Sequence, residues 1–153
     1  MKVCFIGHRV IEKTEELISL LKETVVRFVE NGVTTFLFGS MSEFDSLSWE
    51  IVTEMKETYS SIKRVYVRSA YQYIDKLYEE YLLKFYEESY FPPKLKNAGK
   101  YSYVERNYAM IDDCTYCVFY YNESYNVPLK RSGTKIAYNY AVKKKKEIIN
   151  LYK

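Results

Sequence analysis

The sequence lacks long hydrophobic runs, an excess of one charge and an even set of cysteines. No apolar run reaches the roughly 18 residues of a membrane-spanning helix, and no apolar leader follows Met1. Basic residues number 23 and acidic residues 20, so the net charge is only +3 and nucleic acid is not the expected partner. Three cysteines fit a reducing compartment. We therefore expect a soluble, cytoplasmic protein that has no membrane partner.

Motifs for catalysis and for common cofactors are also scarce. Neither GxGxxG nor GxxxxGK[ST] occurs, which argues against a nicotinamide dehydrogenase and a P-loop NTPase. His8 is the only histidine, and it can contact a ligand, act as a base or simply shape a turn. Cys114 and Cys117 form CxxC at the start of an expected buried strand, without a second pair, which favours a core position over zinc or redox chemistry. We expect neither a metal nor a cofactor.

The length and hydrophobic content of the chain suit one domain over residues 1–153. With 153 residues and 48% hydrophobic content, it can bury a single core. Its 18 tyrosines are unusual. Such amphipathic rings could wall a pocket, or they could reflect a compositional bias, and both interpretations stay open here.

Short apolar strands alternate with amphipathic helical patterns. The strand patterns lie at 2–6, 34–38, 64–67, 116–121 and 148–152. Between them, Thr14 can cap one helix, capping-box spacings at 40–43 and 102–105 predict two more, an aromatic helical pattern spans 70–90, and a last helix follows Ser132. This alternation predicts a Rossmann-like α/β fold of three layers, with about five mainly parallel strands and helices on both faces.

Small, polar and basic residues follow four of these strands. They are Gly7, His8 and Arg9, then Gly39 and Ser40, then Arg68 and Ser69, and finally Ser132, Gly133 and Thr134. Because the carboxyl ends of parallel strands share one edge, these residues offer N–H groups and positive charge to a phosphorylated ligand there. Tight turns alone would explain any one of them.

Asp45, behind Phe44 in the second helix, can accept from a ribose hydroxyl or only favour the positive helix end.

Four segments, taken in order, resemble a known superfamily. They are FIGHR after the first strand, GSMSEFD after the second, ERNYAMID before the fourth and SGT at the last helix. The chain resembles the SLOG superfamily of DprA-type and LOG-type Rossmann-like domains, and within it the small YpsA-like proteins. The resemblance implies a homo-oligomer and a pocket for a nucleotide or a nucleotide-derived molecule, such as an ADP-ribose-type signal, with the phosphate at the SGT turn. The expected ligand-binding residues are Gly7, His8, Arg9, Gly39, Ser40, Phe44, Asp45, Arg68, Arg106, Asn107, Ser132, Gly133 and Thr134.

The signature of the LOG enzymes, which hydrolyse N-glycosidic bonds of nucleoside monophosphates, is only partly present. Arg106 keeps the arginine of their R-K-x-x-M segment, whereas Asn107 replaces the lysine. Ala137 stands where the resemblance implies a catalytic glutamate, and alanine can neither stabilise an oxocarbenium-like sugar nor activate water. We therefore favour binding without turnover. The alternative is a LOG-like phosphoribohydrolase that uses Arg106 with Asp45 or Glu105, and single-stranded nucleic-acid binding is a third hypothesis.

Overall fold

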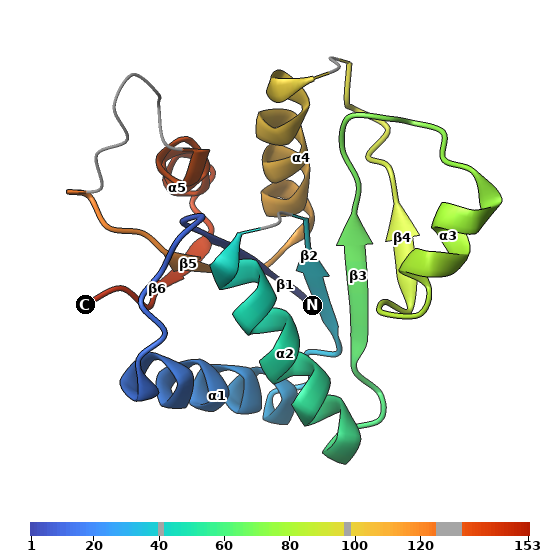
Figure 1. Cartoon of the computed structure of the whole chain (residues 1–153). Helices are drawn as coiled ribbons and strands as arrows, with labels where there is room; N and C mark the ends of the chain where they lie inside the picture. Colours follow the sequence, from blue (N-terminus) through green and yellow to red (C-terminus); the bar gives the residue numbers. More distant parts are fainter. Residues whose placement is uncertain (40–41, 97–98, 125–132) are drawn as a thin grey trace.

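Six parallel strands form one sheet in the computed structural model, which describes residues 1–39, 42–96, 99–124 and 133–153 (Figure 1). The strands are β1 (Lys2–Gly7), β2 (Thr35–Phe38), β3 (Lys63–Val67), β4 (Glu88–Tyr90), β5 (Tyr116–Tyr120) and β6 (Glu147–Asn150). Their spatial order is β4-β3-β2-β1-β5-β6, and all neighbours are parallel. The predicted Rossmann-like α/β arrangement is thus confirmed, with one strand more than expected.

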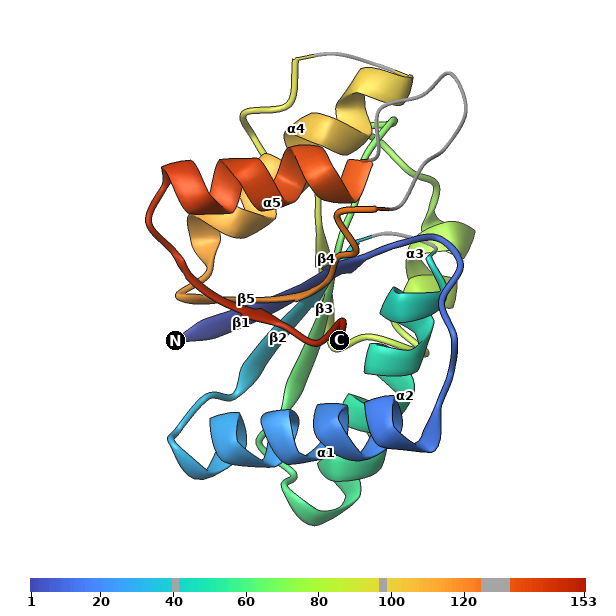
Figure 2. The same cartoon turned by 90° about the vertical axis from the view of Figure 1, so that its left-hand side faces the viewer.

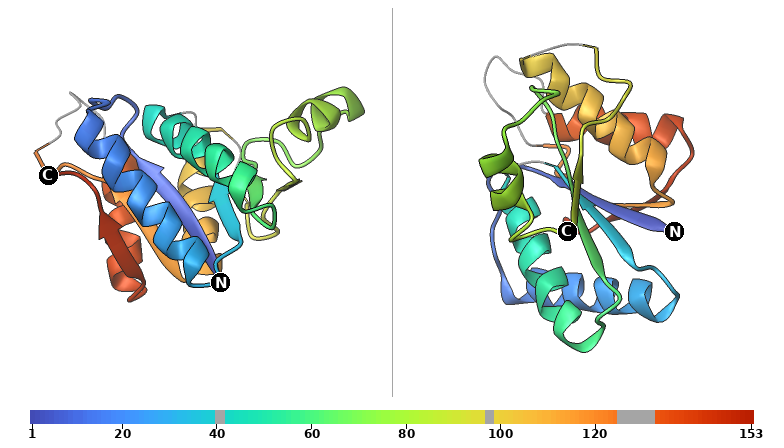
Figure 3. Two further views of the ribbon diagram at one scale, coloured as in Figure 1. Left: turned by 90° about the horizontal axis from the view of Figure 1, so that it is seen from below. Right: turned by 90° about the vertical axis from the view of Figure 1, so that its right-hand side faces the viewer.

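Helices cover both faces of this sheet. They are α1 (Glu15–Glu30), α2 (Glu43–Thr58), α3 (Lys76–Leu82), α4 (Lys100–Asp113) and α5 (Gly133–Lys143). α1 and α2 pack on one face and α4 and α5 on the other, so the sheet is the middle of three layers (Figure 2). α3 lies outside these layers, beside the β4 edge (Figure 3). No helix in the described ranges is both long and apolar enough to cross a lipid bilayer.

Alternating side chains on the central strands fill two cores at once. On β1, Val3 and Phe5 belong to the core under α1 and α2, whereas Cys4 and Ile6 belong to the core under α4 and α5. All four side chains are buried. A strand that is buried on both faces has a continuous apolar sequence, which is why the first strand could be predicted from its letters.

The N-termini of α1 and α2 agree with the sequence only in part. Thr14 caps α1 as predicted, and its hydroxyl accepts from the Leu17 N–H at 3.0 Å. α2 is capped by Ser42, whose hydroxyl accepts from the Asp45 N–H at 3.0 Å. The predicted cap, Ser40, lies outside the described residues. The spacing therefore predicted a helix start in the right place, and the serine that caps the helix is Ser42, two residues after the predicted one.

The predicted capping box at 102–105 is wrong, because α4 begins before it. Gly99 is the residue before the helix and makes no side-chain cap. Ser102 is fully buried, donates to the Gly99 carbonyl at 2.6 Å and accepts from the Ala70 N–H at 3.1 Å. Glu105 accepts from the Lys96 N–H at 2.8 Å. Both side chains hold loops against α4.

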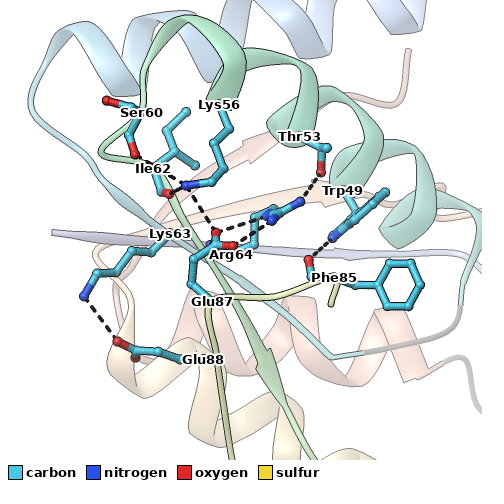
Figure 4. Close-up of polar contacts among 10 residues, drawn as sticks. All are labelled: Trp49, Thr53, Lys56, Ser60, Ile62, Lys63, Arg64, Phe85, Glu87 and Glu88. Carbon is cyan, nitrogen blue, oxygen red and sulfur yellow. Dashed lines mark hydrogen bonds and ion pairs between the residues drawn. The ribbon is translucent and has the colours of Figure 1, made fainter. Parts of the chain in front are cut away.

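The segment 70–90 is not the single helix that its aromatic spacing predicted. It forms the short helix α3 and then β4, which pairs with β3. The Glu87 carboxylate accepts from the Arg64 guanidinium at 2.6 and 3.1 Å and from the Arg64 backbone N–H at 2.9 Å (Figure 4). Trp49 Nε1 donates to the Phe85 carbonyl at 3.1 Å. These contacts tie the end of the segment to β3 and α2.

Candidate functional site

The strand order creates a topological switch point between β1 and β5. From β1 the chain adds β2, β3 and β4 on one side, and it then returns to add β5 and β6 on the other. Open parallel sheets bind ligands in the crevice outside such a point, at the carboxyl ends of the strands. α5 begins at this edge (Figure 2). The edge residues predicted from the strand ends therefore share one side of the sheet with the start of α5.

His8 closes the end of β1 at the switch point. Its side chain is 2% exposed, and Nε2 accepts from the Asn122 N–H, just beyond β5, at 2.8 Å. Burial lowers the pKa of His8, so the ring is neutral at pH 7 and can accept this hydrogen bond. Arg9 is exposed, and its carbonyl accepts from the Glu43 N–H at 2.9 Å. With Nε2 engaged in this way, His8 is better suited to shaping the crevice than to acting as a general base.

Gly7 and Phe44 form a close contact with each other. A Cβ on Gly7 would lie 2.5 Å from the Phe44 ring, so only glycine leaves room for that ring. Phe44 is fully buried, and its ring meets Phe5 edge-on with centroids 6.5 Å apart. These two predicted site residues fix how closely the start of α2 approaches β1, and Phe44 has no exposed face for a ligand.

Gly39, at the end of β2, links two buried charged residues. Its N–H donates to Asp45 Oδ2 at 3.3 Å, and its carbonyl accepts from the Arg106 guanidinium. A Cβ on Gly39 would lie 2.6 Å from Arg106 Cδ, so the arginine side chain packs directly on the glycine. Asp45 and Arg106 are each only 3% exposed. α2 and α4 therefore bring opposite charges together at the carboxyl end of β2.

Arg106 also reaches the end of β3. It donates to Ser69 Oγ at 3.4 Å, and its Nε donates to Asn107 Oδ1 at 3.1 Å. Its guanidinium carbon lies 5.5 Å from the centroid of the Tyr103 ring. Burial lowers the pKa of Arg106, while the charge of Asp45 opposes that shift, and an arginine remains charged in either case. Arg106 thus holds the turns after β2 and β3 in place.

Gly133 opens α5, whereas the preceding Ser132 lies outside the described residues. Gly133 is exposed, and a Cβ on it would meet no described atom within 4 Å. Thr134, the next residue, is buried. Ala137 is 1% exposed and belongs to the core under α4 and α5. Among the described residues nothing crowds Gly133 at the start of α5, while position 137 faces the interior.

An aromatic pocket of about 420 Å³ lies between α2 and α3, beside β3. Six rings line it, those of Trp49, Tyr66, Tyr78, Tyr81, Phe85 and Tyr86. Apart from the tyrosines, the ionisable side chains in its lining are the carboxylates Asp45 and Glu50. Sequence reasoning placed only Asp45 in a site, although the tyrosine content was the signal for such a wall. Four of the 18 tyrosines line this pocket.

A second pocket of about 420 Å³, the Arg68 pocket, adjoins the first through Tyr66 and Tyr78. Arg68 donates to the carbonyls of Tyr71 and Gln72 at 3.4 and 3.2 Å. Within the described ranges it forms no ion pair, and its buried Nε has no hydrogen-bond partner. Asp75 also lines the pocket, but its carboxylate accepts from the Tyr78 N–H at 2.8 Å and is not within ion-pair distance of Arg68. A partly buried guanidinium without an ion pair is suited to an anionic ligand.

The cysteines belong to the core. Cys4, Cys114 and Cys117 are free and buried, as the position of CxxC at the start of a strand predicted. Hydrogen bonds with the other two thiols, together with burial, raise the pKa of Cys4. In the part of the chain that the structure describes, no three His, Cys, Asp or Glu side chains are grouped to hold a metal ion.

Comparisons with known proteins agree with this architecture. The model of the YspA SLOG family matches residues 8–152. Among solved structures, the chain is similar to DNA processing protein A from Helicobacter pylori, which was described for its single-stranded DNA binding mode. The TM-score is 0.61 at 16% sequence identity, over 97% of this chain and 63% of that chain, a likeness that shows the fold. The chain thus spans less than two thirds of that structure, and no curated protein matches its sequence.

Proposed function

The chain belongs to the YspA SLOG family, and on this premise we propose that it binds a nucleotide or a nucleotide-derived small molecule, such as an ADP-ribose-type signal. The ligand lies along the carboxyl edge of the sheet, with its phosphate at the first turn of α5, and it is not turned over. Gly7, Phe44 and Arg106 shape this edge from beneath, whereas Gly133 and Arg68 face the ligand.

One observation carries this proposal, namely that α5 begins at the switch-point edge with Gly133, whose Cβ position no described atom crowds. The first N–H groups of a helix have no partner within the helix, and the helix dipole adds positive potential there. Both features favour a phosphate. Because no described atom lies within 4 Å of the Cβ position of Gly133, a phosphate can approach the backbone from that side.

The position of Ala137 supports binding without turnover. Ala137 has no carboxylate, and because its side chain is buried in the core, a glutamate at this position would not reach the edge. Asp45 and Glu105, the other carboxylates considered, accept from the N–H groups of Gly39 and Lys96. A LOG-like phosphoribohydrolase is the alternative function, and it would need a general base from another position.

Single-stranded DNA serves as a comparison ligand because the structural neighbour was described for that binding mode. At 16% identity, the likeness carries only the fold to this chain. The near balance of 23 basic and 20 acidic residues offers little attraction for a polyanion. An oligonucleotide that bound more tightly than every nucleotide, with a steep loss at higher salt, would favour the nucleic-acid function instead.

A thermal-shift screen tests the proposal with AMP, ADP-ribose, cyclised ADP-ribose isomers and cyclic dinucleotides. A ligand present at 100 times its Kd should stabilise the protein by about 2.7 kcal/mol, which is readily measured. If none of these compounds shifts the melting curve, the proposal is wrong. Chromatography of the AMP mixture shows whether free base is released, and release by the unmodified protein would favour the hydrolase.

We predict that Gly133→Val weakens ligand binding and leaves the fold intact. The valine side chain would occupy the open space through which the phosphate approaches, and no described atom within 4 Å of the Cβ position stands in its way. Calorimetric titration measures the affinity, and Gly133→Ala should show a smaller loss because its side chain is smaller. A well-folded Gly133→Val protein with unchanged affinity would reduce this stretch to an ordinary helix start.

A further inference from the structure

We propose that the aromatic pocket between α2 and α3 is a second binding site, for a small molecule that carries an alkylated ammonium cation. The pocket lies beside β3, which is two strands from β1 in the sheet. It is therefore distinct from the start of α5 at the β1–β5 switch point, although it adjoins the Arg68 pocket through Tyr66 and Tyr78. The proposal does not depend on whether the protein binds a nucleotide.

The six rings of the pocket form a continuous wall. Consecutive ring centroids lie 5.2 to 6.4 Å apart in the order Tyr78, Tyr81, Phe85, Trp49, Tyr86 and Tyr66. Three of these side chains remain open to solvent, with Tyr78 42%, Tyr81 55% and Phe85 39% exposed. The faces of aromatic rings carry negative partial charge, and several such faces around one space attract a cation.

The ionisable groups of the lining, tyrosines apart, are acidic. Asp45 and Glu50 line the pocket, and among the described residues no lysine, arginine or histidine does. Asp45 interacts with the positive charge of Arg106, so Glu50 is the carboxylate that would balance a bound cation. Glu50 is exposed and forms no ion pair in the described ranges.

Trp49 already makes a cation–π contact with an arginine that is not part of the pocket lining. The Arg64 guanidinium carbon lies 5.5 Å from the centroid of the indole ring. Arg64 is held there by Glu87 and by Thr53 Oγ1, which accepts at 3.1 Å (Figure 4). Its charge is thus paired with Glu87, and in the described part of the chain it forms no ion pair with Glu50 of the pocket lining.

This lining distinguishes an alkylated ammonium from other ligands. A phosphate would meet carboxylates and ring faces, with no cation in the lining to receive it. A metal ion requires several oxygen ligands in contact, and the described residues hold no group of three acidic, histidine or cysteine side chains for one. Alkyl groups on a nitrogen spread its charge over a surface that packs against rings and leave few or no N–H groups to satisfy. A volume of about 420 Å³ lies in the range of small-molecule sites.

Choline and its neutral isostere 3,3-dimethylbutan-1-ol are the matched probes, because they differ in the charge of one central atom. Trp49 is the only tryptophan and lines the pocket, so its selectively excited fluorescence reports occupancy. We expect a saturable response to choline and an affinity for the neutral alcohol about tenfold weaker. Equal affinities, or no saturable response to choline, would overturn the proposal.

Two site variants and two matched controls locate the response. Tyr81→Leu and Glu50→Gln each change an exposed side chain of the lining, and each should weaken choline binding about fivefold. Tyr101→Leu, on α4, and Glu57→Gln, on α2, change exposed side chains elsewhere and should leave it unchanged. Equal losses in all four variants, or none in the site variants, would contradict the assignment.

The nucleotide screen on the same proteins separates this inference from the proposed function. Choline binding without any nucleotide binding would refute the proposed function alone. Nucleotide binding without a response to choline would refute the cation site alone.

Discussion

At the ends of β2 and β3, Arg106 is 3% exposed and donates to the Gly39 carbonyl and to Ser69 Oγ. Asp45, also 3% exposed, interacts with the positive charge of Arg106. We predict that Arg106→Ala lowers the free energy of unfolding by about 3 kcal/mol, because it leaves a buried carboxylate without that charge. Urea unfolding at pH 7 measures the loss.

Arg27→Ala is the matched control, since Arg27 is exposed on α1 and its loss should change stability by less than about 0.5 kcal/mol. The sequence predicted a ligand-binding role for Arg106 and gave no sign of this buried position. An Arg106→Ala protein as stable as the control would restore that view and contradict the buried role.

Position 137 offers a second test with a single residue. Ala137 is 1% exposed, so Ala137→Glu would place a carboxylate in the core under α4 and α5. We predict a loss of about 3 kcal/mol or more in the free energy of unfolding at pH 7. Val142→Glu, at a position of α5 that is 54% exposed, should cost far less. Equal stability of the two variants in urea unfolding would show that position 137 is open to the crevice after all.

At the scale of helices and strands, the sequence predicted where elements lie better than where they begin. Apolar periodicity identified every strand of the sheet except β4, and Thr14 was correctly identified as a cap. Capping-box spacing misled at 102–105, where Ser102 bonds to the Ala70 N–H. A serine two or three residues from a helix start satisfies the same pattern, and only tertiary contacts decide which backbone group it binds.

The segment 70–90 failed for a different physical reason. Its aromatic residues recur at helical spacing, yet many of them line pockets beside α3 and the ends of β3. β4 has only three residues and is partly exposed, so it lacks the apolar run that marks the inner strands. It pairs with β3, and the ion pair of Glu87 with Arg64 beside it joins residues 23 positions apart, a contact that no local pattern contains.

That ion pair carries the prediction for this element. Burial acts to raise the pKa of Glu87, but hydrogen bonds from Arg64 outweigh it and leave the pKa below its ordinary value. The contribution of Glu87 to stability is therefore present above its unfolded pKa of about 4.3 and is lost as the pH falls through its lower folded pKa. We predict that Glu87→Gln costs about 1 to 2 kcal/mol at pH 7, and that its difference from the unmodified protein shrinks below about pH 4.

Urea unfolding at pH 7, 5 and 3 measures this difference. Glu88→Gln is the control, because the adjacent Glu88 pairs with Lys63 at 3.2 Å on the surface, with side chains 58% and 55% exposed. Such a solvent-exposed ion pair contributes little to the free energy of unfolding. A pH-independent effect of Glu87→Gln would show that the carboxylate charge is not what holds β4.

At the scale of the whole molecule, the edge of the sheet was predictable and the pockets were not. Parallel strands place all their carboxyl ends on one side, so the convergence of Gly7, Gly39 and Gly133 followed from fold class alone. The aromatic pocket combines α2, β3 and α3, which are brought together by the actual path of the segment 70–90. Because that path was mispredicted, Trp49 and Glu50 could not be assigned to a site.

The two cores meet at the sheet, and this sharing determines how the molecule unfolds. Val3 and Cys4 are adjacent in β1 but belong to opposite cores, so neither helical layer can leave without exposing strands that the other layer also covers. We predict a single cooperative transition in urea, as two-state behaviour requires. Trp49 fluorescence reports the α1 and α2 face, while the buried thiols of Cys114 and Cys117 report the α4 and α5 face.

A brief pulse of a thiol-alkylating reagent at each urea concentration, with mass spectrometry of the product, measures thiol exposure beside the fluorescence curve. The two midpoints should coincide within error, and so should the midpoint from circular dichroism. Thiol labelling at a urea concentration where Trp49 is still native would show that α4 and α5 open as a separate unit. The start of α5 would then move with that unit, and the phosphate site proposed there would be formed only in part of the native population.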